Sequence, residues 1–289
     1  MSKAEISLKT DVPSLVIRPT SGWVPVNLRE LWSFRELVSH LTLRTITVRY
    51  KQTLLGVAWA VLNPVLTMIV FSIFFGGFAK IPSDGVPYPI FSYAALLPWN
   101  LFPNGLSQGS TSLVANRSMV TKVYFPRLVL PVSSVVSGVV DFLIAFVVLL
   151  GIMFYYNRTA GYEFHFSWAW LTLPLFLLLA LVTALGMALW LSSLNVRYRD
   201  VNYVTPFIVQ FLLFLTPVVY SANMIPAKYQ WIYSLNPMAS VVTGFRWALL
   251  GTSTPPDMRL AISALAALVM LIGGLFFFRR MERSFADLI

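Results

Sequence analysis

The chain has 289 residues, of which 57% are hydrophobic, 15% aromatic and only 11% charged. Soluble domains contain about 45–50% apolar and about 25% charged residues, so this composition excludes a disordered chain and disfavours a soluble globule. The net charge of +10 could indicate a nucleic-acid partner, but membrane proteins also have a basic excess on their cytoplasmic side, and we expect a membrane and no nucleic acid.

The amino-terminal region precedes the first apolar stretch and contains no apolar run long enough for a signal peptide, so the first span should serve as the insertion signal. Residues 1–26 are a leader to which we assign no role and whose flexibility stays open. Residues 27–52 are predicted to form an amphipathic helix in the cytoplasmic interface, with a capping box at Asn27 and Glu30 and apolar residues at helical spacing. A merely solvated helix is the alternative.

Six stretches are long enough to cross a bilayer, whose hydrocarbon core of about 30 Å requires about 20 apolar residues in a helix. They lack strand-like alternation, and lipid cannot satisfy free backbone groups, so each is predicted to be a helix. We therefore expect an all-α membrane protein in which residues 53–289 form one six-span transmembrane domain. The predicted spans are residues about 53–79, 87–115, 128–156, 168–194, 203–221 and 260–278.

A seventh uncharged stretch, residues 229–245, has only 17 residues and is split by Asn236 and Pro237. With six spans both termini are cytoplasmic, and 16 of the 21 Lys and Arg residues then lie inside, in agreement with the positive-inside rule. Residues 229–256 are accordingly predicted to form two short re-entrant helices. Non-helical backbone at that depth is tolerated only beside protein or a water-filled cavity, so Asn236, Pro237 and Arg246 are candidate gate residues.

The motifs of enzymes and metal sites are missing from the sequence. There is no G-x-x-x-x-G-K-[ST] motif to hold nucleotide phosphates. There is no cysteine, and His40 and His165 are too far apart to indicate a metal cluster. The acidic residues are scattered, and neither histidine has an acid on its own helix face. We therefore predict no catalytic residue, no metal and no cofactor in this chain.

Asp141 is the only acidic residue inside a clear span. An intramembrane carboxylate is costly and should face the protein interior with a partner. Two roles stay open for it: a pathway or gating residue, or a structural hydrogen bond to a Ser or Thr of a neighbouring span, which we favour. Arg246 is the ionic partner that we consider.

Aromatic residues of the fifth predicted span share one helix face. Phe207, Phe211 and Phe214 follow one another at i, i+4 and i+7, and Gln210 is nearby. Such a face can stack on sugar rings while amides bind hydroxyl groups, or it can face lipid, and spacing alone favours lipid.

Two short basic segments, residues 117–127 and 195–200, are predicted on the cytoplasmic side. Topology signalling would explain their charge. The first also contains the aromatic pair Tyr124-Phe125, and aromatic residues exposed to water usually require a cover. This pair favours a docking role for the first segment.

Four sequence blocks, in this order, resemble the membrane subunits of ABC exporters that move lipid-linked polysaccharides across the bacterial inner membrane. The resemblance extends from about residue 28 to residue 280, and the third block is most similar to the O-antigen branch. The blocks are RYKQTLLGVAWAVLNP (49–64), YPIFSYAALLPWNLF (88–102), NRSMVTKVYFPRLVLPVSSVVSGVVD (116–141) and LNPM (235–238), the last with Arg246 and Leu249-Leu250-Gly251 downstream.

The resemblance implies a homodimer of this chain with two copies of a separate ATP-binding cassette subunit, on which ATP and Mg would bind. It implies that the amino-terminal helix and the loop between the second and third spans contact that subunit. It also implies a translocation path at the dimer interface, lined by the first and fifth spans. The coupling candidates are then Arg44, Arg49, Tyr50, Lys51, Arg117, Lys122, Tyr124, Phe125 and Arg127, and the channel candidates are Trp59, Phe207, Phe211, Phe214 and Tyr220.

The function that the resemblance implies is that of a multi-pass inner-membrane subunit of an ATP-driven exporter. Its substrate would be a lipid-linked polysaccharide, with O-antigen on undecaprenyl diphosphate as the best match. Export of capsule or teichoic acid is the alternative within transport. A membrane-embedded enzyme of glycan or lipid assembly is the alternative from another class.

Overall fold

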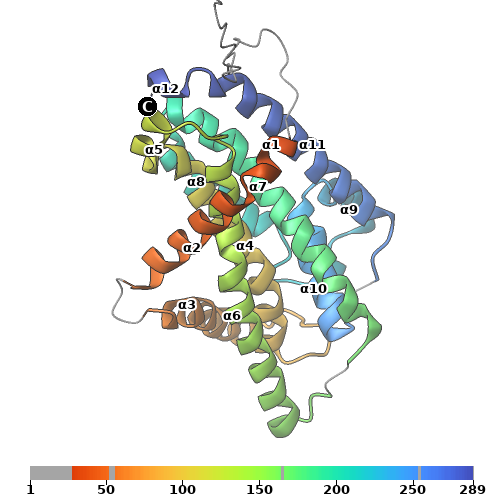
Figure 1. Ribbon diagram of the computed structural model, residues 1–289. Coiled ribbons are helices and arrows are strands. Elements are labelled where there is room, and N and C mark those ends of the chain that lie inside the picture. The colour runs from red at the N-terminus through yellow and green to blue at the C-terminus, as the bar shows by residue number, and fades with distance from the viewer. Residues whose placement is uncertain (1–27, 52–55, 164–165, 253–254, 289) are drawn as a thin grey trace, which may run out of the picture.

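The computed structural model describes residues 28–51, 56–163, 166–252 and 255–288, and every regular element among them is a helix (Figure 1). The predicted leader and the cap at Asn27 lie outside these residues. In chain order the helices are α1 Leu28–Ser33, α2 Arg35–Lys51, α3 Ala58–Phe71, η1 Ser72–Phe78, α4 Tyr88–Ala115, α5 Arg117–Lys122, α6 Val129–Thr159, η2 Trp168–Thr172, α7 Leu173–Arg197, α8 Val201–Leu215, η3 Ala222–Met224, α9 Ala227–Tyr233, α10 Pro237–Leu250, α11 Met258–Glu282 and α12 Phe285–Leu288.

Four helical segments of the described chain are long and apolar enough to cross a membrane, with mean hydropathies between 2.0 and 2.7. They coincide with the first, third, fourth and sixth predicted spans, and they confirm the prediction of an all-helical chain with membrane-crossing helices. The segments are Ala58–Phe78, Val129–Thr159, Trp168–Arg197 and Met258–Glu282.

The second and fifth predicted spans correspond to helices of a different kind. Helix α4 has 28 residues but is not among the four apolar segments, because amide, proline, glycine and serine residues lower its hydropathy. Helix α8 has only 15 residues and ends at Leu215, before the predicted limit at residue 221. The reason is local: Thr216 has extended backbone dihedrals, the conformation that a following proline imposes.

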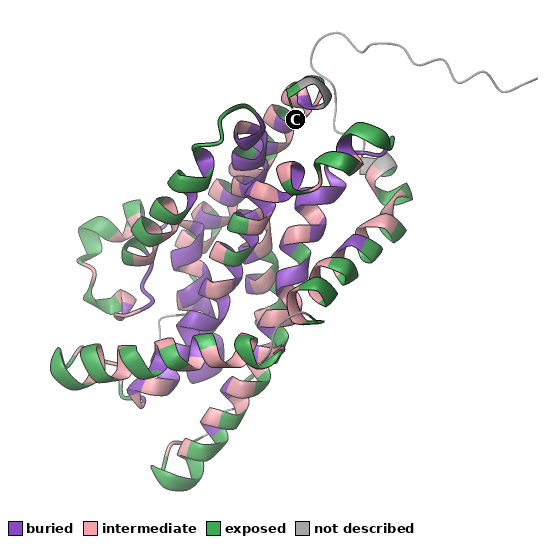
Figure 2. Ribbon diagram, turned by 90° about the vertical axis from the view of Figure 1, so that its left-hand side faces the viewer, coloured by how far each residue is buried: buried purple, intermediate pink, exposed green. Residues whose placement is uncertain are grey.

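Helix α4 is the centre of the bundle and contacts α3, α6, α7, α8 and α10. Figure 2 shows the buried residues concentrated in the central helices, with exposed residues along the outlying ones. Small side chains permit close approach at this centre. A Cβ atom added at Gly109 of α4 would lie 2.6 Å from the Cβ of Ala188 on α7. The core therefore depends on α4 even though it is one of the less apolar helices.

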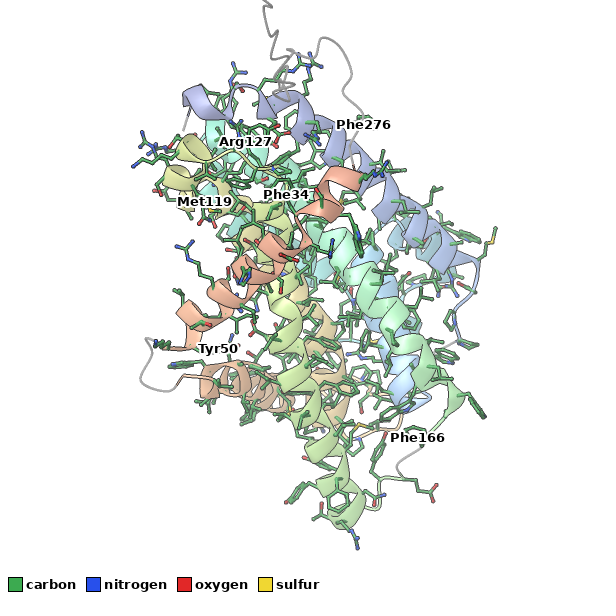
Figure 3. All side chains as sticks on the ribbon, in the orientation of Figure 1. Phe34, Tyr50, Met119, Arg127, Phe166 and Phe276 are labelled. Atoms are coloured by element: carbon green, nitrogen blue, oxygen red, sulfur yellow. The ribbon has the colours of Figure 1, made fainter. Side chains whose placement is uncertain are left out.

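The predicted interfacial helix is interrupted at Phe34, and its longer part, α2, packs along α6. Leu41 is its only described residue that is buried, while Leu43 and Val48 are more than half exposed, so its apolar side chains are not confined to one face. Phe34, Met119 and Arg127 lie toward one end of the bundle, whereas Phe166 lies at the opposite end (Figure 3).

Candidate functional site

The candidate channel residues of α3 and α8 form exposed aromatic surfaces on helices that both pack against α4. The exposed fraction is 51% for Trp59, 71% for Phe207, 58% for Phe211 and 67% for Phe214. Tyr220 differs, because it is partly buried and its hydroxyl donates to the carbonyl oxygen of Phe214 at 3.0 Å. Helix α8 thus presents an aromatic face and α3 an exposed indole, and no other part of the described structure covers either.

Asp141 is bound by the end of α2. The guanidinium of Arg49 forms an ion pair with one carboxylate oxygen, and the hydroxyl of Tyr50 donates to the other. Arg49 also donates to Gln108 of α4 and, at 3.2 Å, to Ser137 of α6. The expectation that Asp141 bonds to Ser or Thr, and the pairing with Arg246, are therefore wrong: the partners are an arginine and a tyrosine that α2 places against α6.

Burial is the main cause, and the hydrogen bond to Asp141 the second, that raises the pKa of Tyr50 to about 12. The phenol therefore stays protonated and able to donate at physiological pH. Two coupling candidates, Arg49 and Tyr50, are thus directed into the molecule. They connect the predicted interfacial helix to helices α4 and α6.

A cavity of about 350 Å³ lies between the end of α2 and helices α3, α4 and α6. We call it the amide cavity, because its wall includes several amide side chains together with the Arg49–Asp141 pair. Sequence reasoning missed these amides, although the three on α4 recur every four residues and so share one helix face. The wall includes the side chains of Trp59, Asn63, Asn100, Asn104, Gln108 and Asp141.

Arg246 is buried, with 2% of its surface exposed, and it holds the non-helical segment after α8. It donates to the carbonyl oxygens of Pro217 at 2.6 Å, Val218 at 2.6 Å and Tyr220 at 2.9 Å. It donates a fourth bond to the carbonyl of Phe91 at 3.2 Å and lies 3.5 Å from the centroid of that ring. Arg246 thus supplies hydrogen-bond partners to backbone that has left its helix.

The other two gate candidates, Asn236 and Pro237, also stabilise the segment that follows α8. The side chain of Asn236 caps α10 by accepting from the amide of Met238 at 3.1 Å, and Pro237 occupies the first turn of that helix. The amide of Asn236 also donates to the carbonyl of Leu215 at 3.1 Å and to the hydroxyl of Thr216 at 3.0 Å. The predicted gate residues therefore fasten α10 to the end of α8.

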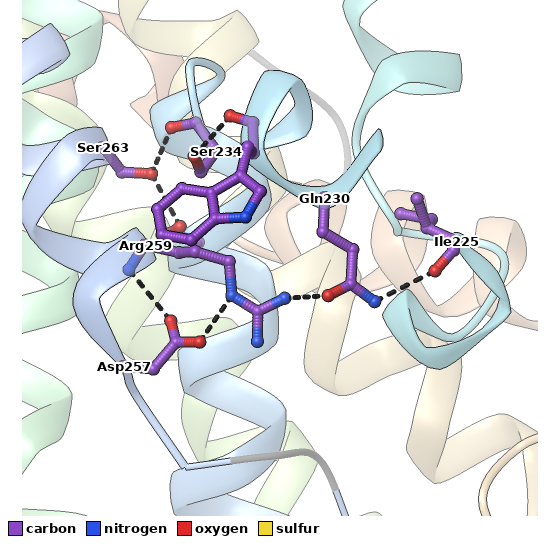
Figure 4. A network of polar contacts seen from close by, with 8 residues as sticks. Ile225, Gln230, Ser234, Asp257, Arg259 and Ser263 are labelled. Carbon is purple, nitrogen blue, oxygen red and sulfur yellow. Dashed lines mark hydrogen bonds and ion pairs between the residues drawn. The ribbon is translucent and has the colours of Figure 1, made fainter. Parts of the chain in front are cut away.

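A second polar network joins α9 to the start of α11 (Figure 4). Arg259 donates to Asp257 at 2.5 Å and also to Gln230. Ser263 donates to the carbonyl of Ser234 at 2.6 Å. A cavity of about 160 Å³ adjoins this network. These bonds fix the predicted re-entrant region to the last long helix.

The predicted docking segment is only partly available at the surface. Tyr124 is 84% exposed, but Phe125 is 6% exposed and packs in a core cluster, so the expectation of a water-exposed pair is wrong for Phe125. The backbone amide of Arg127 donates to the carboxylate of Glu282 at 3.2 Å, and its guanidinium donates to the carbonyl oxygen of that residue. The coupling candidates that stay exposed are Arg44, Lys51, Arg117, Lys122 and Tyr124.

Across the described part of the chain, no group of three or more His, Cys, Asp or Glu residues could hold a metal ion.

Residues 36–250 match the family model described as "ABC-2 type transporter". The chain is similar to the "O-antigen export system permease protein RfbA" of Klebsiella pneumoniae, with 28% identity over 254 residues, which are 88% of this chain and 95% of that protein. A Myxococcus xanthus protein of the same name is 28% identical over 265 residues, or 91% and 98% of the two chains. The "Polysialic acid transport protein KpsM" of Escherichia coli is 24% identical over 248 residues, or 86% and 94%.

Proposed function

Because the chain belongs to the ABC-2 type transporter family, we propose that it is the membrane subunit of an ATP-driven exporter of lipid-linked polysaccharide, with O-antigen on undecaprenyl diphosphate as its substrate. Two relatives named for O-antigen export, similar over most of both chains, support this choice. In this proposal ATP and Mg bind to a separate ATP-binding cassette subunit, present in two copies. The chain itself provides the path and no catalytic group.

The exposed aromatic side chains of α3 and α8 are the observation on which this proposal chiefly depends. Phe207, Phe211 and Phe214 of α8 are each more than half exposed, as is Trp59 of α3. In the proposed homodimer, the faces of two chains enclose a conduit at the interface. A fixed aromatic-lined conduit suits a long glycan, because the glycan can pass through it without being enclosed whole by the protein.

The proposed topology has six spans in the bacterial inner membrane with both termini cytoplasmic. It counts α4 and α8 as spans and treats α9 and α10 as re-entrant helices. The bonds of Arg246 to the carbonyls after α8 support such a placement, since they satisfy backbone that has left its helix. The exposed basic residues Arg44, Lys51, Arg117 and Lys122 then face the ATPase, and Arg49 transmits its movement to α6.

Deletion of the gene in its host tests the function. The proposal expects lipid-linked glycan to accumulate in the cytoplasmic leaflet and surface O-antigen to disappear, with both restored by the intact gene. Loss of capsule or teichoic acid with normal O-antigen would instead favour the alternative substrates, and a relative named for polysialic acid transport makes capsule the stronger of these. Lipid-linked glycan that is no longer completed would favour an enzyme of glycan assembly. Normal display of every surface glycan would refute the proposal.

A further inference from the structure

The amide cavity adjoins one of the channel candidates, because the half-exposed indole of Trp59 forms part of its wall. Its volume of about 350 Å³ lies within the range of small-ligand sites in proteins, about 300–1,000 Å³. Tyr50, at the end of α2, lies at the edge of the bundle where α2 approaches α3 (Figure 3). The cavity thus lies between the segment predicted at the cytoplasmic interface and the candidate path.

Three amide side chains in this wall have no hydrogen-bond partner among the residues that the structure describes. Among the described residues, no hydrogen bond joins the side chain of Asn63, Asn100 or Asn104 to another residue, whereas Gln108 accepts from Arg49. Asn63 and Asn104 are exposed and Asn100 is half-buried, so water or a ligand can reach all three amides. Each amide presents a donor and an acceptor side by side. These accessible amides therefore offer donors and acceptors to water or to a ligand rich in hydroxyl groups.

The charges in the cavity cancel. Arg49 is paired with Asp141, and its remaining contacts are with Gln108 and Ser137. A phosphate or diphosphate group placed against Arg49 would also meet the carboxylate of Asp141, which repels it. A neutral hydroxylated ligand meets no such repulsion, and it can bind to the amides and to the edges of the ion pair.

We propose that the amide cavity binds a single neutral pyranose unit of the glycan as it enters the path, an inference that rests on the proposed export function. Asn100 and Asn104, one helical turn apart on α4, would bind hydroxyl groups from one side. The half-exposed indole of Trp59 would stack on the C–H face of the ring from the other side. The pyranose would thus be held by side chains of a single subunit, before the glycan reaches the conduit between two subunits.

Photocrosslinking in cells tests this site. The photoreactive residue p-benzoylphenylalanine is placed at position 60, an alanine of the cavity wall. The variant is expressed with its ATPase in the host and irradiated. We expect an adduct that reacts with antiserum against the surface glycan and is absent from a strain unable to make that glycan. Asn63→Leu combined with Asn100→Leu should lower its yield about tenfold. A probe at position 178, on an exposed face of α7 outside the cavity, should give no glycan adduct.

A second probe at position 63, on α3, reports the same cavity if the first variant does not accumulate. Adducts at both positions that contain phospholipid but no sugar would overturn the proposal, as would a yield unchanged by the asparagine substitutions. Absence of glycan adducts in a host whose deletion strain traps glycan in the cytoplasmic leaflet would refute the sugar site while leaving the exporter function intact. Normal surface glycan in the deletion strain would refute the exporter function itself.

Discussion

Replacement of Arg246 by methionine should release the segment that follows α8. The side chain donates four hydrogen bonds to buried carbonyl oxygens, and each carbonyl left without a partner costs about 1–3 kcal/mol. Removal of the buried charge recovers part of that cost, since desolvation of an ion in protein costs several kcal/mol. We expect the free energy of opening this segment to fall by about 3 kcal/mol, which increases the open population roughly 100-fold.

The measurement exploits the absence of cysteine from the chain. Val218→Cys introduces a single thiol at a fully buried position of the segment, so its labelling rate by a maleimide reports local opening. In the Arg246→Met background we expect labelling about 100-fold faster. Arg259→Met is the control, because its partner Asp257 is 46% exposed and surface pairs contribute about 0–1 kcal/mol. Equal labelling rates in the Arg246→Met and unaltered backgrounds would refute the assignment of Arg246 as the anchor of this segment.

Two further predictions concern stability measured by thermal unfolding of the purified chain. Arg49→Gln and Asp141→Asn each leave a mostly buried charge unpaired. The double variant should therefore lose less stability than the sum of the two single variants, with a coupling energy of about 1–2 kcal/mol. Additive losses of stability would contradict the ion pair. Gly244→Ala places a Cβ atom 2.2 Å from the ring of Phe176 and should lower the free energy of unfolding by about 1–3 kcal/mol. In the control Gly151→Ala the new Cβ atom points into open space and should not destabilise the chain. Equal thermal unfolding midpoints for the two variants would refute this packing.

The positions of the long helices could be predicted from the sequence because length and hydropathy are local properties. The apolar segments that begin at Val129, Trp168 and Met258 start within two residues of their predicted starts. The first segment begins at Ala58, after residues 52–55, which the structure does not describe. The end of α8 also follows from a local property, because Pro217 restricts Thr216 to extended backbone. The predicted span continues past this point because the stretch stays uncharged.

The partners of the polar residues could not be predicted, because they depend on contacts between distant segments. Arg49 and Asp141 lie 92 positions apart in sequence, and their pairing follows from the packing of α2 along α6. Arg246 was identified as a candidate gate residue from its position, but its partners are backbone carbonyls, which no residue pattern identifies. Phe125 was expected at the surface because it belongs to a basic cytoplasmic segment, yet tertiary packing buries it.

Reconstituted transport tests the central claim most directly. Proteoliposomes would contain the chain, its ATP-binding cassette subunit and lipid-linked glycan extracted from the host, with the nucleotide-binding face outward. The proposed function predicts that added ATP and Mg move the glycan from the outer leaflet to the lumen, where a glycosidase in the external buffer no longer digests it. A glycan that stays fully accessible with ATP, or becomes protected to the same extent without it, would contradict the account.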